Sequence, residues 1–227
     1  MSYGKRIDTL CAHLKKSTVF ADVGCDNGYC SEYMMKNGLC ERAILSDISK
    51  GSLKKAESLL EEYIRSGQAT PVLGNGFFGV PKTTDEVLIA GMGGAEIVQI
   101  LSHPTYGFIP EYFVFQPMHD SEKLRRFLKK QGANIIKDYT FKDGKFYDII
   151  VGEKAKCVEQ GCDYSENDYE FGRDNLKDRP TAFLERTEKL LKDTERYVLK
   201  ENLQEKSKEE LLERKRKLQG VLNGEIK

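Results

Sequence analysis

The run from Val19 to Tyr29 constrains the fold of this chain more than any other segment. Its first residues are apolar as far as Val23, as in a buried strand. The chain then turns through Gly24 and Gly28 before an amphipathic helix. Glycines at such a turn let the backbone approach a ligand closely, and the start of the helix offers free N–H groups. The sequence therefore predicts a strand, a tight loop and a helix, with a ligand at the loop.

This loop differs from the dinucleotide-binding fingerprint at two positions. Counting from Gly24, that fingerprint needs glycines where this chain has Asp26 and Tyr29. A carboxylate here would repel a pyrophosphate, but it suits a ligand with an amine and a sulfonium, which points to S-adenosyl-L-methionine. A tight strand-to-helix turn without a ligand is the alternative interpretation of the same residues.

The composition limits the size, partners and location of the protein. Its 227 residues suffice for one domain of about 150 residues and a smaller unit. Lys plus Arg and Asp plus Glu both number 36, so a polyanion has to be bound by a local patch. No apolar run approaches the roughly 18 residues of a membrane span, and the first ten residues lack the apolar core of a signal peptide. We expect a cytoplasmic protein that does not contact a membrane.

The six cysteines lack the spacing of a zinc site, because no two of them form a Cys-x-x-Cys pair. They are Cys11, Cys25, Cys30, Cys40, Cys157 and Cys162. Without an export signal, free buried thiols in a reducing cytoplasm are the expected state. We therefore expect no metal site.

Short apolar segments alternate with amphipathic ones over the first two thirds of the chain. Strands are predicted at Thr18–Val23, Arg42–Ser46, Ala69–Leu73, Glu86–Ala90, Tyr112–Phe115, Asn134–Tyr139 and Phe146–Gly152. Helices are predicted at 2–16, Cys30–Asn37, from the N-cap Ser49 to Arg65, at Ala95–Leu101, and from Asp120 or Ser121 to Lys130. This order indicates an α/β fold with a mainly parallel sheet covered on both faces and a terminal antiparallel β-hairpin. It is the chain order of the class I, Rossmann-like, methyltransferase sheet, which we assign to residues 1–153.

The sequence changes character near residue 154. Residues 154–179 form a polar connector, and 180–227 consist mostly of helix-forming residues. Phe183, Leu190 and Tyr197 recur every seven residues, and Ser207 with Glu210 predicts a capping box at a second helix. The sequence therefore predicts an antiparallel helical hairpin with coiled-coil packing.

Polar and glycine residues gather where the predicted strands end, the edge at which open α/β sheets bind ligands. The predicted cofactor-binding residues are Gly24, Cys25, Asp26, Gly28, Asp47, Ile48, Asn75, Gly76, Phe77, Gly91, Met92 and Gly93. Asp47 can accept hydrogen bonds from both ribose hydroxyls, or it can share an N-cap role with Ser49. Asn75 and Phe77 can meet an adenine ring, or can belong to a plain turn.

Four motifs give the chain a family resemblance. They are Ala21–Tyr29, Ala90–Gly94, Gln116-Pro117 and Lys145–Val151. In this order they resemble the TrmK family, whose members are bacterial tRNA adenine-N1 methyltransferases that act on the adenosine at position 22. The resemblance covers about residues 2–153, and the stretch Tyr169–Gly172 and the helical tail are also similar. Two positions depart from the family pattern: Asn27 replaces a common His, and Met118 replaces a frequent Asn.

The resemblance implies S-adenosyl-L-methionine as methyl donor and a folded tRNA as acceptor. The acceptor nitrogen already carries a lone pair, so the enzyme has to position the base and stabilise the positive charge that develops on it. By position, Asp26 and Gln116 are the candidates for stabilising that charge, and Tyr29 for bordering the base. In a folded tRNA the target base has to be exposed or turned out of its stack.

Two clusters of basic residues are candidates for binding the tRNA backbone, although each can also be a solvated helix face. They comprise Arg125, Arg126 and Lys129 in one helix, and Arg214, Lys215, Arg216 and Lys217 in the last helix. We expect the protein to act as a monomer. Two other functions stay open from the sequence: a methyltransferase for small molecules, and a non-catalytic module that binds S-adenosyl-L-methionine or RNA.

Overall fold

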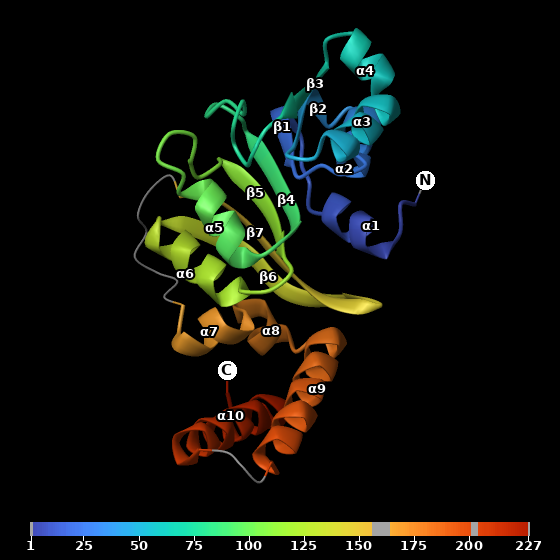
Figure 1. Cartoon of the computed structure of the whole chain (residues 1–227). Helices are drawn as coiled ribbons and strands as arrows, with labels where there is room; N and C mark the ends of the chain where they lie inside the picture. The colour runs from blue at the N-terminus through green and yellow to red at the C-terminus, as the bar shows by residue number, and fades with distance from the viewer. Residues whose placement is uncertain (1, 156–163, 201–203, 227) are drawn as a thin grey trace.

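The structure is a computed structural model that describes residues 2–155, 164–200 and 204–226. Within these residues, seven strands form one sheet in the order β3-β2-β1-β4-β5-β7-β6 (Figure 1). The strands are β1 Ser17–Val23, β2 Cys40–Asp47, β3 Ala69–Leu73, β4 Glu86–Met92, β5 Tyr112–Pro117, β6 Ala133–Asp143 and β7 Lys145–Lys154. Strands β1 to β5 run parallel, and β7 pairs antiparallel with β5 and β6. The predicted parallel sheet with a terminal hairpin is therefore confirmed.

Helices cover both faces of the sheet, and later helices form a part of the molecule below it (Figure 1). Those that follow or precede the parallel strands are α1 Lys5–Cys11, α2 Tyr29–Lys36, α3 Lys50–Leu59, α4 Glu61–Arg65, α5 Gly94–Leu101 and α6 Ser121–Lys130. The later ones are α7 Glu166–Phe171, α8 Arg173–Asp178, α9 Thr181–Val198 and α10 Glu205–Asn223. Among the described residues, no helix is both long and apolar enough to span a membrane.

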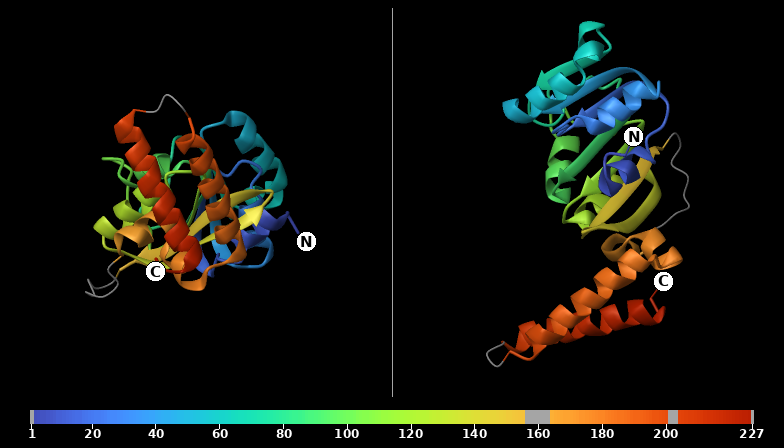
Figure 2. Two further views of the ribbon diagram at one scale, coloured as in Figure 1. Left: turned by 90° about the horizontal axis from the view of Figure 1, so that it is seen from below. Right: turned by 90° about the vertical axis from the view of Figure 1, so that its right-hand side faces the viewer.

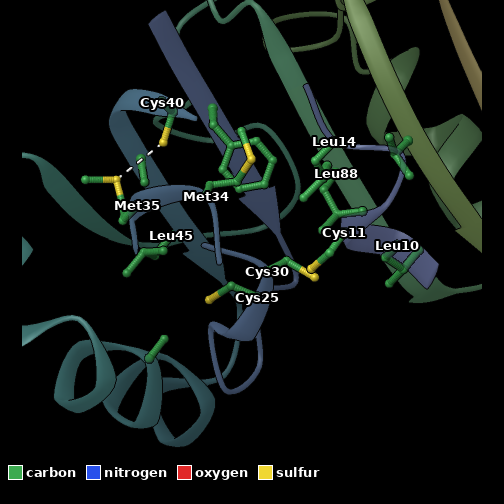
Figure 3. Packing of buried hydrophobic residues seen from close by; sticks show 14 of the residues in the cluster. Leu10, Cys11, Leu14, Cys25, Cys30, Met34, Met35, Cys40, Leu45 and Leu88 are labelled. Carbon is green, nitrogen blue, oxygen red and sulfur yellow. Dashed lines mark hydrogen bonds between the residues drawn. The ribbon is translucent and has the colours of Figure 1, made fainter. Parts of the chain in front are cut away.

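Alternating side chains of the buried strands build two hydrophobic cores. Leu45 and Leu88 belong to the core on the face covered by α1, α2 and α3, where Met34 is also buried (Figure 3). The neighbouring residues in the strands, such as Val23 and Ile89, point to the face covered by α5 and α6. The near-continuous apolar character of the parallel strands thus follows from burial on both faces. In the part of the chain described, the free cysteines are Cys11, Cys25, Cys30 and Cys40, all buried, while Cys157 and Cys162 lie outside the described residues.

Three predicted helix boundaries are wrong for identifiable reasons. Helix α1 is much shorter than the predicted 2–16, because the backbone turns after Cys11. In the segment between α1 and β1, Lys15 N donates to the Glu86 carboxylate. The helix after Ser49 breaks at Leu60, whose side chain is fully buried near Gly28, and resumes as α4. Helix α10 begins at Glu205, so Ser207 lies inside it and does not form the predicted capping box.

Helices α9 and α10 lie side by side and project away from the sheet (Figure 2). Arg179 anchors the end of α10, because its guanidinium donates to the carbonyls of Val221 and Leu222 at 2.6 and 2.7 Å. Phe183 is buried at this junction, whereas Tyr197, predicted in the same heptad position, is 53% exposed. The helical hairpin is present, and its coiled-coil packing stays a prediction.

Candidate active site

A cavity of about 430 Å³ opens at the carboxyl edge of the parallel strands. Its walls include Gly24, Asp47, Ile48, Asn75, Gly91 and Met92, which come from the ends of four different strands. The volume falls in the range of small-molecule sites. The strand ends predicted to share one ligand therefore do meet around one cavity.

The glycine loop after β1 is shaped by close contacts with the end of β4. Gly24 has a φ of 77°, and a Cβ on it would lie 2.4 Å from the Met92 methyl carbon. The Gly24 and Cys25 N–H groups both donate to the Ser46 carbonyl, at 2.7 and 3.1 Å. There is therefore no space for a side chain at position 24, and the backbone itself borders the cavity, as expected for a glycine loop that approaches a ligand closely.

Asp47 links this loop to the beginning of α3. Its carboxylate accepts hydrogen bonds from Ser49 N at 2.7 Å and from Asp26 N at 3.1 Å. The N-cap of α3 is Ser49, whose hydroxyl accepts from Ser52 N. A carboxylate has about four acceptor positions, so two remain for a ligand in the cavity.

A second carboxylate, Asp22, is buried beneath the same loop. Ser31 Oγ donates to it at 2.9 Å, and it borders a small cavity of about 80 Å³. Burial raises the pKa of Asp22 to about 7, and the charges of Asp47 and Asp26 act in the same direction. The loop is thus surrounded by three carboxyl groups, an arrangement that attracts a cationic ligand.

Arg6, at the beginning of α1, is a site residue that the sequence analysis missed. Its Nε donates to Gln116 Oε1 at 2.9 Å, and a Cβ on Gly91 would lie 3.0 Å from its terminal nitrogen. The side chain lines both the 430 Å³ and the 80 Å³ cavities. The partner is 110 residues away in sequence, so neither helical spacing nor a motif could have identified it.

The structure places Gln116 and Tyr29 differently with respect to the open site. Gln116 is fully buried, its Oε1 is bound to Arg6, and its Nε2 donates to Pro117 O at 3.0 Å. Because both the oxygen and the nitrogen of this amide already have partners inside the protein, Gln116 is not positioned for the predicted direct contact with a base. Tyr29 is 39% exposed and packs on Tyr3, with ring centroids 5.3 Å apart.

Phe77 and the Cys25 thiol belong to the hydrophobic interior. The Phe77 ring is 2% exposed and stacks on Phe108 with the ring centroids 4.4 Å apart, so little of it is available for the predicted contact with an adenine. Its neighbour Phe78 is 48% exposed instead. The Cys25 side chain is buried, and this burial raises the pKa of its thiol.

Arg125 cannot bind RNA as predicted, because its side chain is 1% exposed. Its Nε donates to both carboxylate oxygens of Asp138 at 2.9 Å, and its Nη1 donates to the Tyr169 carbonyl at 3.1 Å. The guanidinium therefore ties α6 and α7 to β6. Desolvation acts to lower the pKa of Arg125, but Asp138 and Asp148 outweigh it and keep the group charged.

Most of the other predicted RNA-binding residues have partners within the protein. Arg126 pairs with Glu122 and Glu166 at 2.8 and 2.6 Å, and Lys129 lies 5.5 Å from the Tyr164 ring centre. Lys215 pairs with Glu195 at 3.0 Å, and Lys217 pairs with Glu170. In the described part of the chain, Arg214 and Arg216 form no ion pair. Nor do its residues contain a cluster of three or more side chains able to hold a metal.

The sheet order and the cavity at the carboxyl edge define a class I, Rossmann-like, methyltransferase fold. The family model of TrmK, described as tRNA (adenine(22)-N(1))-methyltransferase, matches residues 20–223, and the chain belongs to this family. It is 28% identical over 156 residues to the tRNA (adenine(22)-N(1))-methyltransferase of Bacillus subtilis, which covers 67% of this chain and 66% of that protein. The chain is therefore an S-adenosyl-L-methionine-dependent methyltransferase.

Solved structures share the fold over nearly the whole chain. A Streptococcus pneumoniae protein in complex with S-adenosyl-L-methionine matches with a TM-score of 0.84 and 22% identity, over 97% of this chain and 100% of that one. Mycoplasma capricolum TrmK in complex with S-adenosyl-homocysteine matches with a TM-score of 0.85 and 21% identity, over 99% and 98% of the two chains. The similarity therefore includes the helical hairpin as well as the sheet.

Proposed function

We propose that this protein transfers the methyl group of S-adenosyl-L-methionine to ring nitrogen 1 of an adenosine in tRNA, at position 22. The observation that carries the proposal is the cavity beside Asp47 and Gly24 in a chain of this family. When bound, S-adenosyl-L-methionine supplies a methyl group on a cationic sulfur. The residues at the cavity match such a ligand in size and in charge.

The predicted cofactor residues divide into four roles in this proposal. Asp47 binds the ribose hydroxyls through its remaining acceptor positions, and Ile48 with Asn75 and Gly76 borders the adenine. The backbone of Gly24, Cys25 and Gly28 follows the methionine part, and Gly91, Met92 and Gly93 leave room for the transferred group. These are the residues that line or adjoin the cavity.

We assign Arg6 to the carboxylate of the methionine part. A guanidinium can donate two parallel hydrogen bonds to a carboxylate, which lysine cannot do. The hydrogen bond to Gln116 fixes Nε and leaves the terminal nitrogens free to face the end of β4. Gln116 is then a positioning residue for Arg6 rather than a group that touches the base.

On the acceptor side, we propose that Asp26 and Tyr29 border the base. The Asp26 carboxylate is 64% exposed, it accepts a hydrogen bond from Asn27 Nδ2, and Lys55 lies 4.0 Å away. The Tyr29 ring is held by Tyr3 and leaves one face open. Both residues lie at the rim of the cofactor cavities, where a base has to arrive.

We further propose that the hairpin formed by α9 and α10, in residues 180–227, binds tRNA together with Arg126 and Lys129. Arg214 and Arg216 are exposed and offer charge that ion pairs do not neutralise in the described part of the chain. Residues 1–153 would then bind the cofactor, and 154–179 would connect the two parts. In this arrangement the enzyme works in the cytoplasm as a monomer, without a metal and away from membranes.

The test is incubation of the protein with radiolabelled S-adenosyl-L-methionine and total bacterial tRNA, followed by mapping of the labelled base. Label in N1-methyladenosine at position 22 supports the proposal. Label in small molecules of a cell extract, with none in tRNA, would support a small-molecule methyltransferase instead. Cofactor binding without transfer to any acceptor would support a non-catalytic module.

A further inference from the structure

The loop after β5 holds His119 directly against the end of β4. Two backbone hydrogen bonds join these segments: Gly94 N donates to His119 O and Met118 N donates to Met92 O, both at 2.8 Å. A Cβ on Gly93 would lie 2.5 Å from the imidazole Cε1 and 2.9 Å from its Nε2. The imidazole therefore lies over Gly93, and any side chain at position 93 would displace it.

Asp120 fixes the orientation of this imidazole. Its Oδ2 lies 2.9 Å from His119 Nδ1, and its Oδ1 lies 3.0 Å from Lys123 Nζ. The backbone of Asp120 is in the left-handed region, with a φ of 56°, which brings its carboxylate next to the preceding side chain. Lys123, followed by His119, keeps the pKa of Asp120 below its ordinary value, so the carboxylate is ionised at neutral pH.

An ionised carboxylate at Nδ1 favours the tautomer that carries its proton on Nδ1. Nε2 is then the acceptor of the neutral ring. The His119 side chain is 70% exposed, so this acceptor is open to an incoming group. Asp120 is the charged group paired with the ring, and Lys123 pairs with the other oxygen of Asp120. The segment packed beneath the ring contributes the uncharged Gly93 and Gly94.

The pair of His119 and Asp120 lies between two cavities. Met92, the residue before Gly93, lines the 430 Å³ cofactor cavity. On the other side, Asp120 lines a cavity of about 620 Å³ that continues to α7 and α10. His119 therefore adjoins a residue of each cavity: its imidazole lies over Gly93, which follows Met92, and its partner Asp120 lines the cavity that continues to the helical hairpin.

We propose that His119, oriented by Asp120, accepts a hydrogen bond and then a proton from the exocyclic amino group of the adenine that is methylated. This inference rests on the proposed function. In the reaction, the N1 lone pair forms the bond to the methyl carbon, and the carbon–sulfur bond breaks with its electron pair on sulfur. The positive charge passes from sulfur to the base, which makes its amino group acidic. That proton moves to Nε2 and then to solvent.

The experiment compares His119→Ala, His119→Gln and Asp120→Asn with the wild-type protein. Its readouts are single-turnover methylation of tRNA as a function of pH and the cofactor dissociation constant from calorimetry. His103→Ala, which removes another exposed histidine, is the matched control. Because His119 is exposed, the thermal transition of each variant should stay unchanged, and this is measured first.

We expect His119→Ala to reduce the rate by about 10²-fold, in the range of general acid–base catalysis, with unchanged cofactor affinity. The pH profile of the rate should differ between the wild type and His119→Ala, and added imidazole should restore part of the rate. Asp120→Asn should reduce the rate less. Equal rates for His119→Ala and His103→Ala, or an unchanged pH profile, would overturn the inference. An inactive wild type would instead contradict the proposed function and remove the basis of this inference.

Discussion

At the scale of single residues, the backbone places three carboxyl groups, Asp22, Asp26 and Asp47, around one turn. Asp47 is the most constrained of them, since it accepts from two backbone N–H groups and still lines the cavity. The N-cap function belongs to Ser49. Of the two roles that the sequence left open for position 47, the N-cap role therefore belongs to its neighbour, and ribose binding stays a proposal.

We predict that Asp47→Ala weakens binding of S-adenosyl-L-methionine. The decrease should correspond to one or two hydrogen bonds to a charged group, about 1.5–3 kcal/mol each. Calorimetry measures it, and Ser49→Ala is the control, because that change removes the helix cap and leaves the carboxylate. Unchanged cofactor affinity in Asp47→Ala, with an intact fold, would show that another group holds the ribose.

The buried Asp22 predicts a pH dependence of cofactor binding. Its pKa in the folded protein is about 7, so it is mostly protonated at pH 6 and mostly ionised at pH 8. A cationic ligand favours the ionised form, so affinity should rise with pH across this interval. The rise should be at most about tenfold, because the ionised fraction increases from about 0.09 at pH 6 to about 0.91 at pH 8. The ligand's own titration is the same for every variant, so the difference between wild type and Asp22→Asn isolates this carboxylate. Parallel pH profiles for the two proteins would exclude the role.

At the scale of elements, the buried Arg125 explains why α6 and α7 stay fixed to the edge of the sheet. It contacts Asp138 in β6 and the carbonyl of Tyr169 in α7, while Asp148 in β7 lies 3.8 Å away. Asp148 in turn accepts from Arg186 in α9 at 2.6 Å. One network of charges therefore joins the terminal β-hairpin to the helices that follow it.

We predict that Arg125→Met destabilises the protein by about 3–5 kcal/mol, because Asp138 would stay buried without its partner. Urea unfolding gives the free energy, and Arg126→Gln, in the same helix but exposed, should leave it nearly unchanged. Cofactor affinity should be retained in the folded fraction, since the network does not touch the cavity. If tRNA binding fell while stability did not, Arg125 would be an RNA-binding residue after all.

The order of the strands and of the helices between them could be predicted from the sequence, while α7 and α8, in the segment predicted as a connector, and the partners of the polar residues could not. Alternating apolar and amphipathic segments carry the information on strands, helices and the glycine turn, because that pattern is local. The burial of Arg125 depends on Asp138 and on Tyr169, which is 44 positions further along the chain. The role of Arg6 depends on Gln116 in the same way.

Neither the burial of Phe77 nor the first residue of α10 could be predicted from the local sequence. The loop after β3 offers Phe77 and Phe78 in succession, and only the packing against Phe108 decides which ring is buried. Ser207 and Glu210 have the spacing of a capping box, but helix α10 begins before them. Local signals of this kind are weak, and tertiary contacts override them.

At the scale of the whole molecule, the distribution of charge over the sheet and the helical hairpin matters more than the total. The formal net charge is zero, so a tRNA has to bind to a local patch of positive charge. The cavity of about 620 Å³ between the two parts is lined by six acidic and four basic side chains, which does not favour phosphate inside it. The tRNA-binding residues that we propose on the helical hairpin are therefore the exposed basic ones of α10.

This division predicts that the four basic residues at 214–217 are not equivalent. Lys215 and Lys217 are paired with Glu195 and Glu170, so replacing them breaks ion pairs within the protein. Arg214 and Arg216 have no ion pair in the described part of the chain. Replacing these two by glutamine should weaken tRNA binding and lower the slope of log K against log salt concentration. The decrease should be roughly 0.7–0.9 for each phosphate that the helix no longer neutralises.

The matched control is the double variant Lys215→Gln with Lys217→Gln, which removes the same charge from the same helix. It should change the salt slope less and the melting temperature more, because both lysines act mainly between α10 and its neighbours. Filter binding at several salt concentrations measures both variants, and calorimetry checks that cofactor affinity is unchanged. If replacing all four residues left the slope as in the wild type, the run would be a solvated helix face, and the tRNA would have to be held elsewhere.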